Sequence, residues 1–556
     1  MGQKTIIIGG VAGGATAAAR LRRIDETADI VMFERGEHVS FANCGLPYYV
    51  GNVIKEREDL LLSSPELFRR RYNIDVRVAT EVVAIDRSRK RVDVRDRRSG
   101  EVYTEDYDQL LLSPGAEPIR PPLEGIDEER FFTVRNVPDT DRIKAFVDER
   151  RPRTAVVVGG GFIGLEMAEN LVHRGVSVAI VEMLDQVMPG MDIEMAAFIH
   201  DHLREKGVDL RLGDGVDRFD REDGRIRVKT KSGETIPCDM VVLSVGIRPE
   251  SGLAREAGLD VAKDGRIRVD ETMRTSDPDI FAVGDAAEMR NFVTGLPTAT
   301  PLAGPANKQA RVAADNIAGR RSIFRGTLGT AVVKVFDLAV ASTGCSEKRL
   351  VHNELPYRVS YTHSGSHAGY YPGAESIAVK LIFCPGSGRV LGAQMIGRAG
   401  VDKRIDVVAT AIRGGMTVFD LEELELAYAP PYGSAKDPVN IAGNVAANLM
   451  KRDVDNAYHY QVGADDLKDA VLLDLRTQPE LEEEGMIDGA VHIPIDQLRD
   501  RLGELDRDAT YIPYCAVGYR GYVGHRMLAQ HGFKSRNLSG GYETYRIASQ
   551  RFNRQS

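Results

Sequence analysis

Cys44 is the residue at which the chemistry of the first half of the chain is expected to centre. It lies in the stretch Ser40–Tyr48 (SFANCGLPY), and the positions five residues before and after it are Val39 and Tyr49 rather than cysteines. A thiol without an internal partner can pair with a small external thiol, carry a persulfide or be oxidised to a sulfenic acid. We expect a helix to begin just after Cys44 and to lower the pKa of its thiol, because a helix N-terminus favours negative charge.

Cys515 is the second cysteine in a pattern that indicates chemistry. It follows a strand predicted over 511–514 and opens the loop CAVGYR, which ends at Arg520 and precedes a helix predicted over 522–530. A strand, a tight loop and a helix N-terminus surround a sulfur atom with backbone N–H groups, which stabilise a thiolate or a persulfide anion. The stretch resembles the active loop of rhodanese sulfurtransferases, whereas related phosphatases have a longer loop that suits phosphate. We therefore favour sulfur as the substrate; the alternative is a degenerate rhodanese fold used only for binding.

The elements that must position Cys44 begin at the first residues of the chain. The apolar run Lys4–Ile8 is followed by the glycine loop Gly9–Gly14 (GGVAGG) and a helix predicted over 15–23. This order lets a pyrophosphate lie on a helix N-terminus, although Val11 replaces the second glycine of the G-x-G-x-x-G fingerprint and a generic strand–helix turn is the alternative. The next predicted strand ends in Glu34, whose carboxylate can accept hydrogen bonds from a ribose diol. The cofactor contacts expected here are Gly9, Gly10, Ala12, Gly13, Gly14, Glu34 and Arg35.

A second dinucleotide-binding unit begins with the strand Ala155–Val158. It continues into the complete G-x-G-x-x-G loop Gly159–Gly164 and a helix predicted over 165–174. The following strand, Ser177–Val181, ends at Glu182, and an acidic residue there favours an unphosphorylated ribose. We therefore prefer NADH over NADPH as the electron donor. The contacts expected here are Gly159, Gly161, Phe162, Ile163, Gly164, Glu182 and Gly246.

Two further segments are typical of a flavin site. Residues 75–112 are predicted to be rich in strands and end in an apolar strand, which is followed by Pro114 and Gly115. The segment 275–285 places Asp285 on a turn after an apolar strand, where its carboxylate suits a hydrogen bond to the ribityl chain of FAD. We expect Pro114, Gly115 and Asp285 to contact FAD.

By these motifs, residues 1–450 resemble the FAD- and NAD(P)H-dependent disulfide reductase family. The segment Ser40–Gly45 resembles its single-cysteine branch, the coenzyme A disulfide reductases and NADH-dependent persulfide reductases. The resemblance implies FAD, NADH or NADPH, and coenzyme A, with hydride passing from NADH to the flavin N5 and electrons then reaching a sulfur–sulfur bond at Cys44. Carried over by position, the residues implied to bind coenzyme A and its phosphates are Thr16, Arg20, Arg23, Ser40, Asn43 and Lys436. For Arg20 and Arg23, a solvated helix face is the alternative.

Residues 326–450 are predicted to form a mixed α/β domain, with strands near 330–336 and 377–383 and helices near 401–414 and 438–450. The resemblance implies that this domain makes a homodimer and that Tyr428 reaches the partner's flavin and sulfur site. A phenol near Cys44 can donate a proton to a leaving thiolate. The second family tyrosine maps to Tyr370, with Tyr371 as an alternative. The competing interpretation makes these tyrosines part of the buried core.

Composition limits the remaining possibilities. The net charge of −9 over 556 residues argues against a nucleic-acid partner, and the five cysteines show no C-x-x-C spacing. We expect no metal, no signal peptide and no membrane span, and hence a reduced, cytoplasmic enzyme. Cys238, Cys345 and Cys384 are expected to be structural thiols without a role.

The predicted fold class is α/β, with two Rossmann-like domains for FAD and NAD(P)H, an α/β dimerisation domain and a C-terminal rhodanese-like α/β domain. The predicted boundaries are residues 1–112 and 245–325 for FAD, 113–244 for NAD(P)H, 326–450 for dimerisation, 451–462 for a linker and 463–556 for the rhodanese domain.

The combination of domains narrows the function. A reductase that only recycles coenzyme A disulfide has little use for a sulfurtransferase domain, whereas one that cleaves persulfides or polysulfides does. The leading hypothesis is an NADH-dependent reductase of coenzyme A persulfide, polysulfide or elemental sulfur that releases sulfide, with coenzyme A disulfide as a secondary substrate. One alternative is an NADH oxidase or peroxidase that uses Cys44 as a sulfenic acid. Another is a sulfur carrier that acts through Cys515, with the flavoprotein part as a redox sensor.

Overall fold

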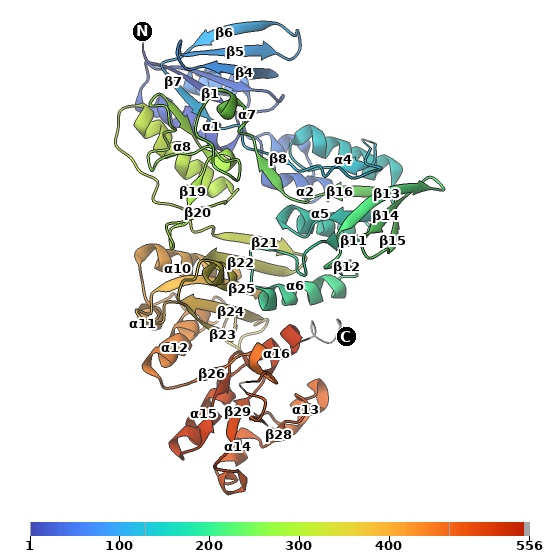
Figure 1. Ribbon diagram of the computed structural model, residues 1–556, viewed down its shortest axis with the longest axis vertical. Helices are drawn as coiled ribbons and strands as arrows, with labels where there is room; N and C mark the ends of the chain where they lie inside the picture. Colours follow the sequence, from blue (N-terminus) through green and yellow to red (C-terminus); the bar gives the residue numbers. More distant parts are fainter. Residues whose placement is uncertain (1, 128, 466, 550–556) are drawn as a thin grey trace. The chain divides into compact units, whose positions relative to one another are not determined.

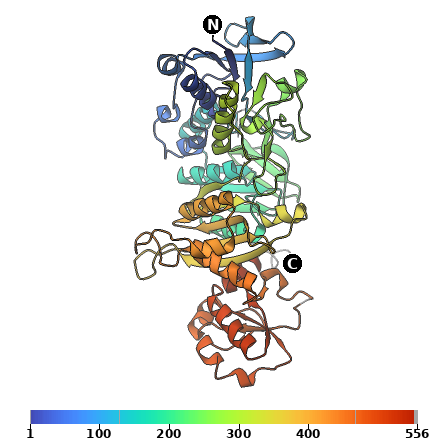
Figure 2. The ribbon, with the colours of Figure 1, turned by 90° about the vertical axis from the view of Figure 1, so that its left-hand side faces the viewer.

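The computed structural model describes residues 2–127, 129–465 and 467–549. The chain divides into two compact units, the first made of Met1–Asp185 and Gly207–Gly329 and the second of Gln186–Lys206 and Thr330–Ser556. Figure 1 labels the elements along the chain, and Figure 2 shows the same ribbon from another side. Among the described residues, no helix is long and apolar enough to cross a membrane.

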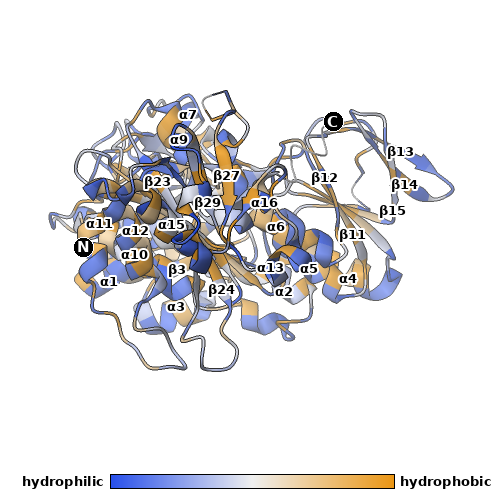
Figure 3. Ribbon diagram, turned by 90° about the horizontal axis from the view of Figure 1, so that it is seen from below, coloured by the Kyte–Doolittle hydropathy of each residue, from blue (hydrophilic) through white to orange (hydrophobic). Residues whose placement is uncertain are grey.

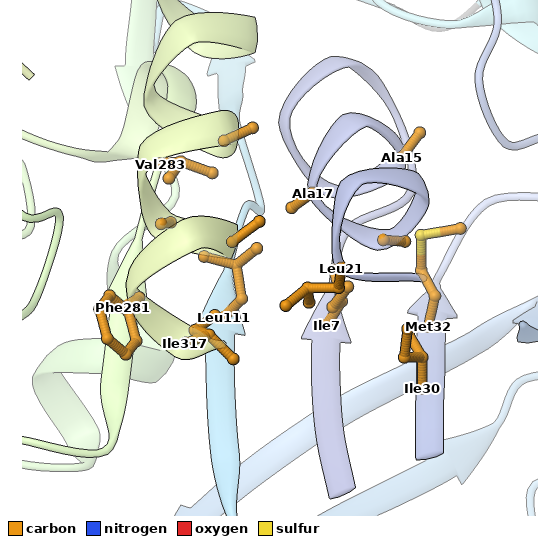
Figure 4. Close-up of a cluster of buried hydrophobic side chains, with 14 of the residues drawn as sticks. Ile7, Ala15, Ala17, Leu21, Ile30, Met32, Leu111, Phe281, Val283 and Ile317 are labelled. Carbon is orange, nitrogen blue, oxygen red and sulfur yellow. The ribbon is translucent and has the colours of Figure 1, made fainter. Parts of the chain in front are cut away.

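The first unit contains a five-stranded parallel sheet in the order β18-β7-β1-β2-β3. Its strands are short apolar runs because both faces are covered. Helices α1 and α8 cover one face, where Leu21 and Ala17 of α1 pack over Ile7 and Met32 (Figure 4). The elements are β1 (Lys4–Ile8), α1 (Ala12–Ile24), β2 (Asp29–Glu34), β3 (Asp75–Val78), β7 (Gln109–Leu112), β18 (Ile280–Ala282) and α8 (Ala303–Ile317).

The opposite face of this sheet buries a second apolar cluster, to which Val92 and Val94 of a three-stranded antiparallel sheet contribute. Short elements connect these layers. They are η1 (Asn43–Gly45), α2 (Leu46–Val50), η2 (Arg57–Leu60), α3 (Pro65–Tyr72), β4 (Thr80–Asp86), β5 (Arg91–Asp96), β6 (Val102–Asp106), β8 (Ala116–Pro118), β17 (Ile247–Pro249), α7 (Gly252–Glu256), η3 (Gly284–Ala286), β19 (Met289–Arg290) and β20 (Pro297–Thr298).

A second parallel sheet in the first unit has the order β12-β11-β10-β16-β9, with an antiparallel sheet of β13, β14 and β15 beside it. Helix α4 buries Val137, Ile143 and Val147 at helical spacing, and Figure 3 shows hydrophobic and hydrophilic sectors on its ribbon. The elements are β9 (Phe131–Phe132), α4 (Val137–Arg150), β10 (Thr154–Val158), α5 (Phe162–His173), β11 (Ser177–Glu182), β12 (Asp209–Leu212), β13 (Val216–Glu222), β14 (Arg225–Thr230), β15 (Thr235–Cys238) and β16 (Met240–Leu243).

The second unit begins with an antiparallel sheet in the order β21-β22-β25-β24-β23, against which α10 and α12 pack. Helix α6 also belongs to this unit, although the predicted NAD(P)H-binding domain includes its residues. The elements are α6 (Ile193–Glu205), β21 (Ala331–Val335), β22 (Leu338–Gly344), α9 (Glu347–His352), β23 (Arg358–Gly365), β24 (Ser376–Phe383), β25 (Val390–Gly397), α10 (Val401–Gly414), α11 (Val418–Glu423) and α12 (Pro438–Lys451).

A buried ion cluster explains why α6 belongs with this sheet. The ammonium of Lys380 on β24 is fully buried and lies 2.9 Å from Asp192, 2.5 Å from Glu194 and 2.5 Å from Glu347. Three carboxylates this close together have the spacing of a metal site, but a protein cation already lies among them. Burying these charges is tolerable only because they are paired.

The last part of the second unit is a parallel sheet in the order β28-β27-β29-β30, flanked by helices. The segment predicted as a linker contributes to this part, because β26 within it pairs with β31 and Ala457 is buried in the same apolar cluster as Tyr514. The elements are β26 (Asn456–Ala457), η4 (His459–Gln461), β27 (Val471–Asp474), α13 (Gln478–Glu484), β28 (Val491–His492), α14 (Ile495–Leu498), η5 (Leu502–Glu504), β29 (Thr510–Tyr514), α15 (Tyr519–Gln530), β30 (Lys534–Ser535), β31 (Asn537–Leu538) and α16 (Gly541–Ser549).

Candidate active site

Cys44 lies in the short 3₁₀ helix η1, directly before α2, and its side chain is exposed. Two backbone hydrogen bonds hold Ser40 in place. Its N–H donates to Gly10 O at 2.8 Å, and its carbonyl accepts from Leu62 N at 3.1 Å. Ser40 itself has a left-handed φ of 48°, so the chain turns sharply between the glycine loop and the cysteine. The glycine loop and Cys44 are therefore adjacent parts of one site.

The environment of Cys44 raises the pKa of its thiol, and the sequence-based expectation of a lowered pKa is wrong. Partial burial is the main cause, and the carboxylates of Glu166 and Asp285 add to it. Helix α2 has only five residues, so its N-terminus offers a weak dipole against two nearby negative charges.

Glu166 is a residue of this site that sequence reasoning missed. Its pKa is raised to about 7 because burial penalises its charge and Glu169 lies nearby, while a hydrogen bond that it accepts from Tyr48 opposes the rise. The Tyr48 hydroxyl donates to Glu166 Oε1 at 3.3 Å. Only its position in the sequence could have indicated this role. Glu166 is two residues after the second glycine loop, in the first half of α5, and its partner Tyr48 is four residues after Cys44.

The first glycine loop fits a dinucleotide. A Cβ at Gly14 would come within 1.8 Å of Gly9 O, so only glycine allows α1 to pack this closely on β1. Glu34, at the end of β2, accepts a hydrogen bond from Gly10 N at 2.8 Å, which brings its carboxylate to the loop. Asp285 lies on η3, and burial raises the pKa of its carboxyl group. Arg35, by contrast, is engaged by Glu117 and Glu250.

The second glycine loop fits a dinucleotide as well. A Cβ on Gly164 would come within 2.0 Å of Gly159 O, whereas one on Gly161 would meet open space at the start of α5. Glu182 accepts hydrogen bonds from Gly160 N at 2.7 Å and Leu184 N at 2.8 Å, which fixes its carboxylate beside the loop. The first residues of α5, Phe162 and Ile163, are exposed, and Gly246 has a left-handed φ of 112°.

The residues expected to bind coenzyme A divide between the two units. In the first, Thr16 Oγ1 donates to Asn307 Oδ1 at 2.8 Å, and Arg20 pairs with Asp315 at 2.8 Å. Arg23 is exposed on the same helix, as is Asn43 beside Cys44. Lys436 is exposed in the second unit.

Asn307 is a further polar residue that the sequence did not single out. It lies on α8, and it meets Thr16 only because α1 and α8 pack side by side. A contact between helices so distant in the chain has no local sequence signal.

Two of the predicted tyrosines meet in the second unit. The hydroxyls of Tyr370 and Tyr428 are 2.6 Å apart, and the side chains are 76 % and 46 % exposed, which contradicts the interpretation as buried core residues. Of the two candidates, Tyr370 rather than Tyr371 contacts Tyr428. The hydrogen bond to Tyr428 raises the pKa of Tyr370.

Arg404 holds the loops that carry these tyrosines. Its guanidinium is buried on α10 and donates to Ser366 O at 2.7 Å and to Asp437 Oδ2 at 2.9 Å. A backbone hydrogen bond of 2.9 Å from Ala368 N to Gly433 O joins the same two loops. Lys436 directly precedes Asp437, the partner of Arg404, in the second of these loops.

Cys515 lies at the end of β29 and is 1 % exposed. The N–H of Gly518 donates to its Sγ at 3.2 Å, as the predicted loop requires. The first turn of α16 packs on the loop, because Tyr542 N donates to Cys515 O at 2.8 Å. A Cβ on Gly541 would come within 2.4 Å of the same oxygen.

Arg520, at the end of this loop, forms an ion pair. Its guanidinium donates to both oxygens of Glu480 on α13, at 2.8 and 2.5 Å, and this contact is the main reason that the pKa of Arg520 is raised. Cys515 contributes to the same rise, so Arg520 lies near the thiol. Glu480 is a second residue that sequence reasoning missed, since it is forty positions earlier in an acidic run.

The other cysteines differ in their surroundings. Cys238 and Cys345 are buried, and burial raises the pKa of each thiol. Cys384 is partly exposed, and hydrogen bonds from Ser387 lower the pKa of its thiol.

Comparisons with known families agree with these features. The family described as pyridine nucleotide-disulphide oxidoreductase matches residues 3–310, and the dimerisation domain of that family matches residues 330–437. The rhodanese-like domain matches residues 461–548.

Individual relatives cover most or all of the chain. The coenzyme A disulfide reductase of Staphylococcus haemolyticus is 38 % identical over 448 residues, which are 80 % of this chain and 100 % of the relative. The crystal structure of reduced Bacillus anthracis CoADR-RHD has 50 % identity and a TM-score of 0.97, with 99 % of both chains covered. The NAD-dependent persulfide reductase from A. fulgidus has 41 % identity and a TM-score of 0.91, over 98 % of this chain and 100 % of that one.

Proposed function

Because the chain belongs to the pyridine nucleotide-disulphide oxidoreductase family, we propose that it is an NADH-dependent reductase of coenzyme A persulfide, polysulfide or elemental sulfur that releases sulfide. Coenzyme A disulfide is a secondary substrate. The observation that carries the proposal is the combination, in one chain, of the unpartnered Cys44 beside two dinucleotide loops and of Cys515 in a rhodanese-like domain.

Cys44 is the proposed nucleophile. Its thiolate attacks the inner sulfur of coenzyme A persulfide, so that a disulfide between Cys44 and coenzyme A forms and hydrosulfide leaves. With coenzyme A disulfide, the same attack releases coenzyme A thiolate instead. When bound, FAD and NADH supply the hydride that reduces the mixed disulfide and restores the Cys44 thiolate and coenzyme A thiol.

We assign the other proposed roles from the charge, the exposure and the position of the side chains. Glu182, held beside the second loop with Met183 and Leu184 after it, supports a preference for the uncharged ribose of NADH. Arg23 and Lys436 offer exposed positive charge to the phosphates of coenzyme A. In a homodimer, which the dimerisation domain supports, Tyr428 donates a proton to the thiolate that leaves Cys44 of the other subunit.

The test is anaerobic NADH oxidation by the purified flavoprotein, with coenzyme A persulfide and coenzyme A disulfide compared and sulfide assayed alongside. We expect faster turnover of the persulfide, with one sulfide released for each NADH. Preference for the disulfide with no sulfide would make the enzyme a thiol-recycling reductase. Oxygen consumption at a rate similar to the sulfur-dependent rate would favour the oxidase alternative.

Replacement of Cys44 by serine tests the mechanism itself. We expect NADH-dependent sulfide release to disappear while the flavin content is unchanged. Sulfide release that survives Cys44→Ser would contradict the proposed attack.

A further inference from the structure

The cation at the Cys515 site is neutralised before any substrate arrives. Arg520 and Glu480 form a two-pronged ion pair, with 28 % and 30 % of their side chains exposed. Glu480 Oε2 also accepts hydrogen bonds from Thr477 N at 2.8 Å and Thr477 Oγ1 at 2.7 Å, as part of the capping box of α13. The cap fixes the Glu480 side chain, so the ion pair does not depend on a bound ligand. These contacts lower the pKa of Glu480 to about 2, and its charge persists at any working pH.

The space beside the loop is uncharged as well. A cavity of about 90 Å³ lies between this loop and the antiparallel sheet of the same unit. Gly518, whose N–H donates to Cys515 Sγ, lines the cavity, together with Tyr361, His363, Val445 and Tyr519. None of the fifteen lining residues is an aspartate, glutamate, lysine or arginine.

His363 does not supply the missing positive charge. Burial lowers the pKa of its imidazole, with the carboxylate of Glu543 opposing the shift from 3.5 Å away. The other ring nitrogen, Nε2, lies 2.8 Å from Thr544 Oγ1 on α16. A second arginine, Arg476, lies 4.1 Å from the ring centroid of Tyr542 in the turn packed on the loop, but it is paired with Asp474 at 2.8 Å and with Glu484 at 3.0 Å.

From these contacts, we propose that Cys515 accepts sulfane sulfur from thiol persulfides whose reacting end is uncharged and discriminates against thiosulfate, and that Glu480 sets this preference. The inference rests on the proposed function and names the donor class for its sulfur-collecting site. Thiosulfate is a dianion, and its attack by a thiolate brings three negative charges together. A free arginine would offset one of them, but Glu480 cancels that charge. A neutral persulfide has no such requirement.

The step balances without an added oxidant or reductant. The thiolate of Cys515 attacks the outer sulfur of R–S–SH, a bond forms between Cys515 Sγ and that sulfur, and the S–S bond of the donor breaks. Its electron pair leaves with R–S⁻, and the proton stays on the transferred sulfur. The products are the Cys515 persulfide and the thiolate of the donor. With thiosulfate, the leaving group would be sulfite, another dianion at the same ion pair.

Glu480→Gln tests the proposal, because the amide oxygen can still accept from Thr477 while the negative charge is lost. The full-length protein with Cys44→Ser, which removes the reductase thiol, is treated with coenzyme A persulfide or with thiosulfate. Mass spectrometry then follows the gain of one sulfur atom at Cys515. We expect Glu480→Gln to raise the ratio of thiosulfate to persulfide loading rates at least about tenfold. The matched control is Glu482→Gln on the same helix, which should leave the ratio unchanged.

A second measurement needs no substitution at the site. Salt screens repulsion between charges, so thiosulfate loading with Glu480 in place should speed up as the ionic strength rises, while persulfide loading should not. An unchanged ratio in Glu480→Gln, or equal loading by both donors with Glu480 present, would overturn the proposal. Neither assay contains NADH, so this outcome is separate from failure of the reductase mechanism, which the NADH-dependent assay reports.

Discussion

Cys44 and Cys515 are both free cysteines, but they differ in their exposure and in the groups that lie near their sulfur atoms. Cys44 is exposed on a short 3₁₀ turn, and the carboxylates of Glu166 and Asp285 help to raise the pKa of its thiol. Cys515 is buried, receives a backbone N–H from Gly518 and lies near Arg520.

The difference suggests a division of labour. The Cys515 loop provides its own donors for a charged sulfur, so it can store a persulfide with protein groups alone. The protein around Cys44 disfavours a lone negative charge, so a thiolate there depends on the groups that bind beside it. Under the proposed function, Cys515 would be the storage site and Cys44 the turnover site.

The largest expected effect is a reciprocal loss in two single variants. Cys44→Ser should reduce NADH-dependent turnover of coenzyme A persulfide and coenzyme A disulfide about a thousandfold or more, because the nucleophile is gone. Cys515→Ser should leave both rates within about twofold, yet abolish sulfur loading of the last domain. Steady-state NADH oxidation and mass spectrometry check the two halves. If Cys515→Ser also stopped reduction of free coenzyme A persulfide, the two sites would not be separable.

The tyrosine pair gives the next largest effect and concerns only the reductase half. Tyr428→Phe should lower kcat about a hundredfold, because the proposed general acid is removed. Tyr370→Phe should cost at most about tenfold, since it removes only a hydrogen bond to Tyr428. Stopped-flow measurement distinguishes the two variants, because only Tyr428→Phe should slow the release of the leaving thiolate itself. Equal losses in both variants would contradict the assigned roles.

Replacement of a glycine by alanine beside each cysteine compares how tightly the Cys515 loop and the Cys44 turn are packed. Gly541→Ala would force a Cβ to within 2.4 Å of Cys515 O at a left-handed φ of 64°, so we expect about 2 kcal/mol lower free energy of unfolding and slower sulfur loading. Gly45→Ala meets the ends of Leu60 and Ile54 side chains, which can shift, and should cost less. Denaturant unfolding of both variants provides the comparison. A larger loss in Gly45→Ala would show that the Cys44 turn is the more rigid of the two.

The smallest expected effect concerns the charge beside Cys44. Glu166→Gln should lower the pKa of the Cys44 thiol, because the Glu166 carboxylate adds to the rise that burial causes. Since the pKa of Glu166 is raised to about 7, its carboxyl is neutral at lower pH, and the variant and the parent should react alike there. Above pH 7 the variant should react faster with iodoacetamide, because Glu166 is charged there and a larger fraction of the thiol is ionised in the variant.

Tyr48→Phe is the matched control for that measurement. It keeps the Glu166 charge but removes a hydrogen bond that lowers the Glu166 pKa, so the difference from Glu166→Gln should begin at a higher pH. Identical pH profiles in all three proteins would mean that Glu166 does not control the thiol.

Much of this arrangement could be predicted from the sequence, because its signals are local. The glycine loops, the strands that precede them and the Cys515 loop have fixed spacings, and the predicted fold class and family resemblance are confirmed. Helices and strands predicted at 401–414 and 377–383 occur as α10 and β24. The domain boundaries and the roles of the site residues stay predictions.

What the sequence could not show depends on pairs that are far apart in the chain. Glu166 reaches the Cys44 site only because α5 packs on α2, and Glu480 meets Arg520 only when α13 folds against the loop. The prediction of a lowered pKa for Cys44 is wrong for the same reason, since a local helix start is visible in the sequence and a distant carboxylate is not.

The segment that joins the two parts of the second unit determines where a stable fragment of the last part can begin. Residues 456–457 pair with β31, Tyr458 donates to Val359 O at 3.0 Å, and Tyr361 N donates to Ser539 Oγ at 3.3 Å. A fragment that started after this segment would lose an edge strand and uncover Leu538. Calorimetry of the whole chain should therefore record one melting transition for the two parts of the second unit rather than two.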